Sequence, residues 1–226
     1  MMLGVLGGMG PAAGVEFMRR LIVQTAAVRD QDRVPAVLWS DPRVPDRSTA
    51  MLAGTNEPLA WLEQGIRGLQ QAGCTRIVIP CNTAHFWYND LVKLGTPITH
   101  IVDAVKEQLR ELSVSGTVAV LGTKATMSMN LYQSRLDMWD CVTPADRLAD
   151  QIQQSINMIK AGYTEDAYKL IAPVVKDFVQ KGAQAIVLGC TELPLAMTQR
   201  WWGETPIVNS IDALVATVTC LPGDCQ

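Results

Sequence analysis

Short apolar runs alternate along this chain with longer segments in which apolar residues recur every three or four positions. The short runs have the length and composition of β-strands, and they occupy Met1–Leu6, Ala36–Trp39, Arg76–Pro80, Ile98–Ile101, Thr117–Leu121, Ala185–Leu188 and Ile207–Asn209. Helical spacing joins Leu59, Leu62, Ile66 and Leu69, then Leu148, Ile152, Ile156 and Ile159, and finally Leu170, Ile171, Val174, Val175 and Phe178. Strands that alternate with helices predict an α/β fold with parallel sheets.

The second half of the chain repeats features of the first half at a nearly constant offset. Cys81 and Cys190 each follow an apolar strand-like run and precede polar residues. Their offset of 109 positions also aligns Gly73 with Gly182, Ile77-Val78 with Ile186-Val187, Thr96-Pro97-Ile98 with Thr205-Pro206-Ile207 and Asp103-Ala104 with Asp212-Ala213. An offset of 115 aligns Val5-Leu6-Gly7 with Val120-Leu121-Gly122. A constant offset over several elements indicates a duplication.

The duplication predicts two pseudo-symmetric lobes, each with a parallel sheet flanked by helices. We expect residues 1–98 with 208–226 to form the first lobe, which carries Cys81, and residues 99–207 to form the second, which carries Cys190. Ligands of open parallel sheets gather beyond the carboxyl ends of the strands. We therefore expect the active cleft between the lobes, with both thiols facing it.

Composition excludes several classes of protein. The 226 residues are 48% hydrophobic and 18% charged, with a net charge of −3, so the chain has no basic surface for nucleic acid. No apolar run reaches membrane-spanning length, and no basic segment with a cleavage site opens the chain. Six cysteines in a chain of this length do not indicate a disulfide scaffold, and two histidines without a Cys-x-x-Cys pair disfavour zinc. We expect a cytoplasmic protein without a metal.

The two matched thiols are the strongest chemical signal. A cysteine thiol has a pKa of about 8.5, and a helix N-terminus after a strand favours the reactive thiolate. Backbone N–H groups of Asn82-Thr83 and Thr191-Glu192 would hold a carboxylate. A single buried cysteine is usually a small apolar side chain. Because two occur in equivalent settings, we favour two-base proton transfer at one carbon, with Cys81 and Cys190 as the bases.

Four segments resemble the aspartate/glutamate racemase family, on its aspartate racemase side: Gly7-Gly8-Met9-Gly10-Pro11, Pro45-Asp46-Arg47, Pro80-Cys81-Asn82-Thr83-Ala84-His85 and Gly189-Cys190-Thr191-Glu192-Leu193-Pro194. The resemblance implies a racemase without pyridoxal phosphate or any other cofactor, usually a homodimer, with one catalytic cysteine from each lobe. Glutamate racemases typically carry His after the second Cys-Thr and Asp-Ser-Gly near the N-terminus. This chain has Glu192 and Gly-Gly-Met-Gly at those places, which disfavours a dedicated glutamate racemase.

A dicarboxylic substrate requires cations for its distal carboxylate. Arg47 is the leading candidate because a guanidinium binds a carboxylate bidentately. The resemblance implies Lys160 as the second cation, although a lysine near a helix end also has a purely stabilising explanation. Met9, Asn82, Thr83, Thr123, Thr191 and Glu192 complete the expected substrate contacts. His85 is expected behind them, where it and Glu192 orient or deprotonate the thiols.

The sequence thus predicts interconversion of L- and D-aspartate, with glutamate or a broader range left open. The partner is then a small amino acid, and neither nucleic acid nor membrane. Maleate isomerisation or hydantoin racemisation on the same scaffold and a non-catalytic dicarboxylate-binding protein are alternatives. Gly8-x-Gly10-x-x-Ala13 also matches a dinucleotide fingerprint, but a tight turn explains it better because Pro11 and the distant Asp41 fit that fingerprint poorly.

Overall fold

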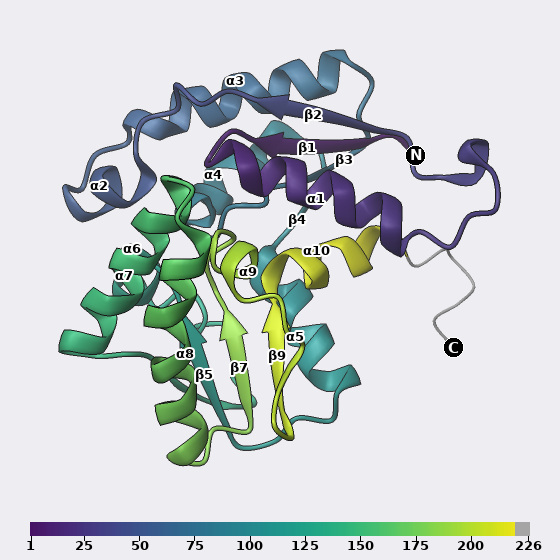
Figure 1. Cartoon of the computed structure of the whole chain (residues 1–226). Coiled ribbons are helices and arrows are strands. Elements are labelled where there is room, and N and C mark those ends of the chain that lie inside the picture. The colour runs from purple at the N-terminus through teal and green to yellow at the C-terminus, as the bar shows by residue number, and fades with distance from the viewer. Residues whose placement is uncertain (220–226) are drawn as a thin grey trace. The chain divides into compact units, whose positions relative to one another are not determined.

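The computed structural model describes residues 1–219, and these residues divide into two compact units (Figure 1). The first unit comprises Met1–Ala104 and the segment that begins at Ile211, and the second comprises Val105–Ser210. The sequence-derived boundaries stand at residues 98 and 207, so each structural boundary lies slightly farther along the chain. Cys220 and Cys225, for which the sequence suggested no role, lie outside the described residues.

The first unit contains a parallel sheet with the strand order β2-β1-β3-β4. The strands are β1 (Leu3–Gly7), β2 (Ala36–Ser40), β3 (Arg76–Val78) and β4 (Ile98–Thr99). The helices are α1 (Pro11–Gln24), α2 (Arg47–Leu52), α3 (Glu57–Gln71) and α4 (Tyr88–Leu91), with 3₁₀ turns η1 (Asp30–Asp32), η2 (Thr83–Trp87) and η3 (Val92–Leu94). Helix α5 (Ile101–Glu111) continues into the second unit.

Helices α1 and α3 cover opposite faces of this sheet. Successive side chains of a strand point to opposite faces, and in β2 Leu38 contacts α1 at Gly14 whereas Trp39 lies against α3. The indole of Trp39 fits there because α3 carries glycine at positions 65 and 68, where a Cβ atom would come within 3.1 Å and 2.3 Å of the ring. The predicted stripe of α3 forms the buried face, with Leu62, Ile66 and Leu69 fully enclosed.

The second unit repeats this architecture with a sheet of order β6-β5-β7-β9-β8. Its strands are β5 (Thr117–Leu121), β6 (Asp140–Val142), β7 (Ala185–Leu188), β8 (Trp201–Trp202) and β9 (Thr205–Asn209), and only β8 runs antiparallel. Its helices are α6 (Lys124–Ser128), α7 (Asp146–Lys160), α8 (Thr164–Gln180), α9 (Leu193–Ala196) and α10 (Ser210–Thr219), the last of which continues into the first unit.

The two sheets share one strand order, since β2-β1-β3-β4 corresponds to β6-β5-β7-β9. The predicted offset of 109 even carries Ile101, the first residue of α5, onto Ser210, the first residue of α10. The predicted α/β class, with two parallel-sheet regions flanked by helices, is thereby confirmed. Within residues 1–219 no helix has both the length and the apolar composition that crossing a bilayer requires.

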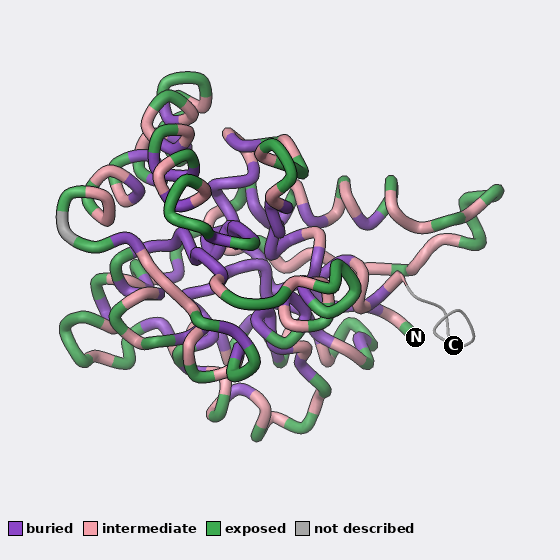
Figure 2. Tube along the Cα trace, turned by 90° about the horizontal axis from the view of Figure 1, so that it is seen from below, coloured by how far each residue is buried: buried purple, intermediate pink, exposed green. Residues whose placement is uncertain are grey.

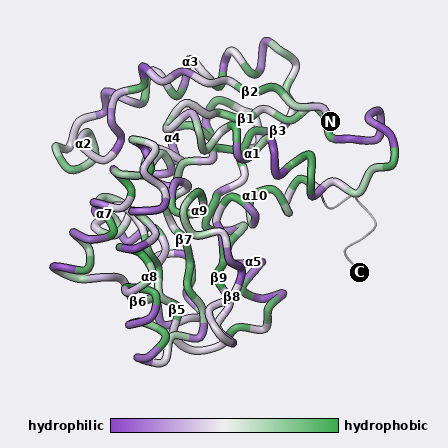
Figure 3. Tube along the Cα trace, in the orientation of Figure 1, coloured by the Kyte–Doolittle hydropathy of each residue, from purple (hydrophilic) through white to green (hydrophobic). Residues whose placement is uncertain are grey.

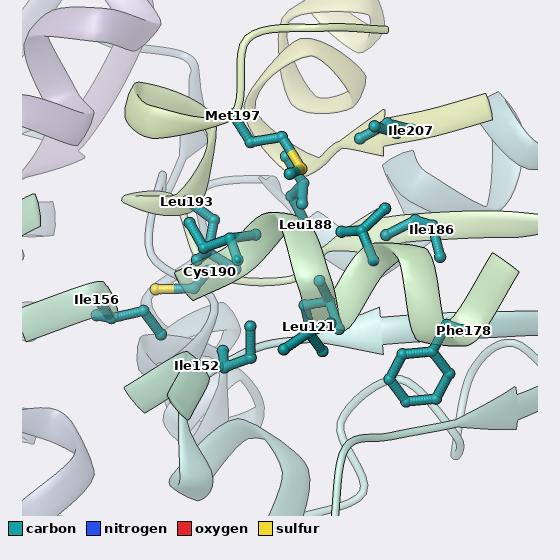
Figure 4. Packing of buried hydrophobic residues seen from close by; sticks show 14 of the residues in the cluster. Leu121, Ile152, Ile156, Phe178, Ile186, Leu188, Cys190, Leu193, Met197 and Ile207 are labelled. Atoms are coloured by element: carbon teal, nitrogen blue, oxygen red, sulfur yellow. The ribbon is translucent and has the colours of Figure 1, made fainter. Parts of the chain in front are cut away.

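Each unit has its own apolar core. Every residue of β1 and β7 is buried. Figure 2 colours the buried segments of the chain purple and the exposed ones green, and the apolar run of β7 is visible as a green stretch in Figure 3. In the second unit the stripes of α7 and α8 pack on β5 and β7, with Ile152, Ile156 and Phe178 in one cluster (Figure 4). All three predicted helical stripes therefore face cores.

Some predicted elements differ from the structure. The run Ile98–Ile101 yields a strand of only two residues, because α5 already begins at Ile101. Strands β6 and β8 were not predicted. Strand β6 contains Asp140, and β8 has two residues and lies at the edge of its sheet, so neither gives the apolar run on which the prediction rested.

Candidate active site

The two matched cysteines lie just beyond the carboxyl ends of equivalent strands. Cys81 follows β3, and Cys190 follows β7, the strand at the corresponding place in the second sheet. Both side chains are buried, with exposed fractions of 6% and 5%, and neither forms a disulfide with a described residue. Each thiol therefore lies at the edge of its sheet where parallel α/β folds bind ligands.

Cys190 has an acidic neighbour at hydrogen-bond distance. Its Sγ donates to Oε2 of Glu192 at 3.0 Å, and the carboxylate is itself 5% exposed. Burial raises the pKa of the Cys190 thiol well above its usual value, and the charge and hydrogen bond of Glu192 raise it further. The Lys160 charge, at the end of α7, acts in the opposite direction. The resting group at Cys190 is thus a protonated thiol that donates to a carboxylate.

This protonation differs from the sequence-based expectation. A helix dipole was expected to favour the thiolate, but α9 has four residues and η2 has five, so few aligned peptide dipoles follow either cysteine. At Cys190 the effects of burial and of Glu192 prevail. Figure 4 shows why burial is strong, because Cys190 lies beside Leu193 and Ile156 at the margin of the apolar cluster.

His85 holds the backbone of the turn that carries Cys81, the first thiol turn. The Nδ1 atom of His85 lies 2.9 Å from the Cys81 carbonyl oxygen, and the Ile101 N–H donates to its Nε2 at 3.2 Å. A ring nitrogen that accepts carries no proton, so His85 is neutral and donates from Nδ1 to Cys81. His85 thus ties the thiol turn to the first residue of α5, and its ring packs on His100 with 4.7 Å between centroids.

Arg47 is a buried cation. It is the first residue of α2, follows the N-cap Asp46, and is 9% exposed. Its Nη1 donates to the carbonyl oxygens of Val44 at 3.1 Å and Pro45 at 3.0 Å, whereas its Nε has no hydrogen-bond partner among residues 1–219. A buried donor without a partner is costly, so this guanidinium is suited to an anionic ligand.

The other expected substrate contacts fall into two groups, one in each unit. In the first unit Met9 and Cys81 belong to one apolar cluster, and Asn82 and Thr83 are buried at the start of η2. In the second unit Thr191 and Glu192 directly follow Cys190 and are buried. Thr123 is the N-cap of α6, where its Oγ1 accepts from the Thr126 N–H at 3.0 Å.

The glycine-rich first loop has a structural explanation. Gly8 has a φ of +89°, and a Cβ atom there would lie 2.4 Å from the backbone oxygen of Asp41. Only glycine permits this turn into α1, so the tight-turn interpretation accounts for the motif without a dinucleotide.

Two side chains that were not predicted from the sequence lie beside the turn that carries Cys190, the second thiol turn. Tyr132, between α6 and β6, and Ser210 are buried and share a hydrogen bond. The offset of 115 that relates the amino-terminal strands also carries Phe17, which is fully buried, onto Tyr132. This alignment was the available signal, but an aromatic residue in an irregular segment belongs to no periodic stripe.

The chain matches a known protein family and resembles proteins of known structure. A family model described as "Asp/Glu/Hydantoin racemase" matches residues 6–218. Among solved structures, the chain is similar to the aspartate racemase of Picrophilus torridus, with 32% identity, a TM-score of 0.87, and coverage of 96% of this chain and 92% of that one.

Similarity to curated sequences extends over most of the chain. The broad specificity amino-acid racemase RacX of Bacillus subtilis is 27% identical over 216 residues, which span 92% of each protein. A glutamate racemase of Aquifex pyrophilus is 28% identical over 65% of this chain and 58% of its own length.

Proposed function

This chain belongs to the Asp/Glu/Hydantoin racemase family and is an amino-acid racemase, an isomerase, and we propose that it interconverts L- and D-aspartate by proton transfer between Cys81 and Cys190. Aspartate is favoured because the similar protein of known structure from Picrophilus torridus is an aspartate racemase. The RacX similarity makes a wider amino-acid range the alternative.

The observation that carries the proposal is the pair of buried thiols after the equivalent strands β3 and β7. A racemase must remove a proton from one face of Cα and deliver another to the opposite face. Two thiols from duplicated halves supply one group for each face. The proposal therefore requires both cysteines to reach the same carbon, one from each side.

The proposed proton transfer requires each thiol to begin the reaction in a particular protonation state. In one direction the Cys81 thiolate takes the Cα proton, and the Cys190 thiol, which is protonated at rest, gives its proton to the carbanion. In the other direction Cys190 must first lose its proton, and Glu192 is the acceptor at 3.0 Å. Each turnover exchanges the protonation states of the two thiols, and proton exchange with solvent restores them.

In this proposal, side chains from both halves of the chain bind the two carboxylates of the substrate. Asn82, Thr83 and Thr191 hold the α-carboxylate, where negative charge grows as the carbanion forms and where preorganised donors help most. Arg47 binds the distal carboxylate through its Nε, which has no partner in the described part of the chain, and Lys160 assists from the end of α7. Met9, Thr123 and Glu192 line the remainder. No cofactor enters these steps.

We further propose that the enzyme is a cytoplasmic homodimer. The cytoplasm fits thiols that must stay reduced to act as acids and bases. Light scattering on the purified protein during size-exclusion chromatography would measure its mass, and a mass near the 24.7 kDa of one chain would contradict the dimer.

The test is incubation with L-aspartate in D₂O without added cofactor, followed by proton NMR and chiral chromatography. We expect the Cα proton signal to disappear as D-aspartate forms. Cys81→Ala and Cys190→Ala should each lower racemisation by at least about 10³-fold, because each removes one acid–base group. Cys141→Ala, which removes a thiol of the second unit with a pKa raised by burial to about 11, is the matched control and should racemise normally.

The outcomes separate the alternatives. Racemisation at the wild-type rate in either single variant would refute the two-base scheme. Binding of aspartate without proton exchange would indicate a dicarboxylate-binding protein. Activity on a hydantoin but not on aspartate would move the substrate to the hydantoin branch of the family.

A further inference from the structure

The second thiol turn is tied to the start of α10 by a chain of two hydroxyl groups. Ser210 is fully buried, and its Oγ donates to the Leu188 carbonyl oxygen at 2.9 Å. Leu188 is the last residue of β7, two residues before Cys190. A serine has one hydroxyl proton, and Leu188 receives it. Ser210 also shares a side-chain hydrogen bond with Tyr132.

Tyr132 also touches the thiol turn directly. A Cβ atom on Gly189 would lie 2.9 Å from Cε2 of the Tyr132 ring and 3.0 Å from Cγ1 of Val120. Glycine at 189 thus lets the ring lie directly against the backbone that precedes Cys190. Burial raises the pKa of the Tyr132 hydroxyl far above its usual value, so this group stays protonated and keeps a hydrogen to donate.

The two halves of the chain use different side chains to link the thiol turn to the start of the following helix. In the first unit His85 links the Cys81 carbonyl to the first residue of α5. The offset of 109 places Pro194, which has no polar side chain, at the position of His85. Ser210 stands at the position of Ile101 and supplies the link itself, with Tyr132 in place of Phe17 behind it.

We propose that Tyr132 is a positioning residue for Cys190, acting through Ser210 to fix the turn that holds the thiol beside Glu192. The inference rests on the proposed function, in which Cys190 is one of the two catalytic groups. A turn that is fixed at Leu188 and packed at Gly189 keeps Sγ at one distance from the carboxylate. Without the hydroxyl chain the turn keeps backbone hydrogen bonds, such as that from the Gly189 N–H to the Leu121 carbonyl oxygen at 2.7 Å, but loses its side-chain link to the start of α10.

The test variant is Tyr132→Phe, which keeps the ring against Gly189 and removes only the hydroxyl. We expect kcat for aspartate to fall about tenfold with KM within about twofold, since the loss acts on the acid–base group and not on substrate binding. Tyr163→Phe, at an exposed tyrosine of the same unit, is the matched control and should leave both constants unchanged.

A second measurement reports on Cys190 without using turnover. Iodoacetamide labelling across a pH series, followed by mass spectrometry of the tryptic peptide 182–200, gives the ionisation of this thiol alone, because that peptide contains one cysteine. In Tyr132→Phe the midpoint should move down towards that of an ordinary thiol, because contact with Glu192 is loosened. Labelling of Cys81 should not change.

The double variant tests whether the two hydroxyls act as one chain. Ser210→Ala should shift the Cys190 midpoint at least as far as Tyr132→Phe, and adding Tyr132→Phe to Ser210→Ala should shift it no further. A Cys190 profile that is unchanged in Tyr132→Phe, or additive shifts in the double variant, would overturn the inference. If the wild-type protein fails to racemise aspartate, the proposed function fails, whereas the labelling experiment still decides the positioning role.

Discussion

Replacing Arg47 tests the proposal that this residue binds the distal carboxylate of a dicarboxylic substrate. The side chain is 9% exposed, its Nη1 is occupied by two backbone carbonyls, and its Nε has no partner among the described residues. A bound carboxylate would therefore use Nε and the remaining Nη2 as a bidentate pair. Arg47→Met removes both donors, and Arg47→Lys keeps the charge but cannot reproduce the planar fork.

The expected fall in kcat/KM follows from the hydrogen bonds to the substrate that Arg47→Met removes. A hydrogen bond from a charged donor contributes about 1.5–3 kcal/mol, so two contribute at least about 3 kcal/mol. Since 1.36 kcal/mol corresponds to tenfold, kcat/KM for aspartate should fall at least about 150-fold in Arg47→Met. The fold should survive, because loss of two bonds to carbonyls is offset by removal of a buried and incompletely paired charge, leaving the free energy of unfolding within about 1 kcal/mol.

The assay compares two competitive inhibitors. Succinate has a distal carboxylate and propionate does not, so Arg47→Met should weaken succinate about 150-fold and propionate by less than about threefold, with Arg47→Lys intermediate for succinate. Urea unfolding monitors the fold. Equal weakening of both inhibitors, with unchanged stability, would mean that Arg47 does not contact the distal carboxylate.

Two further predictions concern the second thiol and the first sheet. Glu192→Gln removes a charge and a charged hydrogen bond that both raise the pKa of Cys190, so that pKa should fall and iodoacetamide labelling of Cys190 near pH 8 should accelerate. Racemisation should slow, because the proposed proton acceptor is lost. Slower labelling of Cys190 would contradict this prediction. The same substitution should change how the free energy of unfolding depends on pH. Because the folded-state pKa of Cys190 is raised, its contribution to stability is fully present below the unfolded thiol pKa of about 8.5 and declines progressively above it. Glu192→Gln should flatten that decline when the free energy of unfolding is measured by urea titration across a pH series. Gly68→Ala places a Cβ atom 2.3 Å from Cζ3 of Trp39, so overpacking of about 1–3 kcal/mol should exceed the helical preference for alanine of about 1 kcal/mol and lower the free energy of unfolding. Gly14→Ala, where the nearest atom is the flexible Leu38 Cδ1 at 3.2 Å, is the control, and equal stability of the two variants would refute the steric argument.

The strands and helices that carry the cores were predictable because burial imposes a period on the sequence. Thr117–Leu121 and Ala185–Leu188 were predicted with the bounds that β5 and β7 have, since a strand buried on both faces is apolar throughout. The stripes of α3, α7 and α8 were predictable for a similar reason, because one helical face must be apolar. Strands β6 and β8 lie towards the sheet edges and are short, so they left no such pattern.

The protonation state of Cys190 could not be predicted from the sequence. The sequence places Glu192 two residues after the cysteine, but a helix start was expected to favour the thiolate. The sign of the pKa change depends on the burial of both side chains, on the 3.0 Å contact and on the shortness of α9. None of these quantities follows from spacing.

The sequence by itself determined the α/β class, the duplication and the two thiol motifs, because strand burial, helical periodicity and a constant offset are properties of residue order. Tertiary structure alone decided that His85 holds the Cys81 carbonyl, that the Arg47 Nε is buried with no partner in residues 1–219, and that Tyr132 and Ser210 reach the second thiol turn. Those contacts join residues distant in the chain, and their energies depend on distance and burial, which only the folded chain defines.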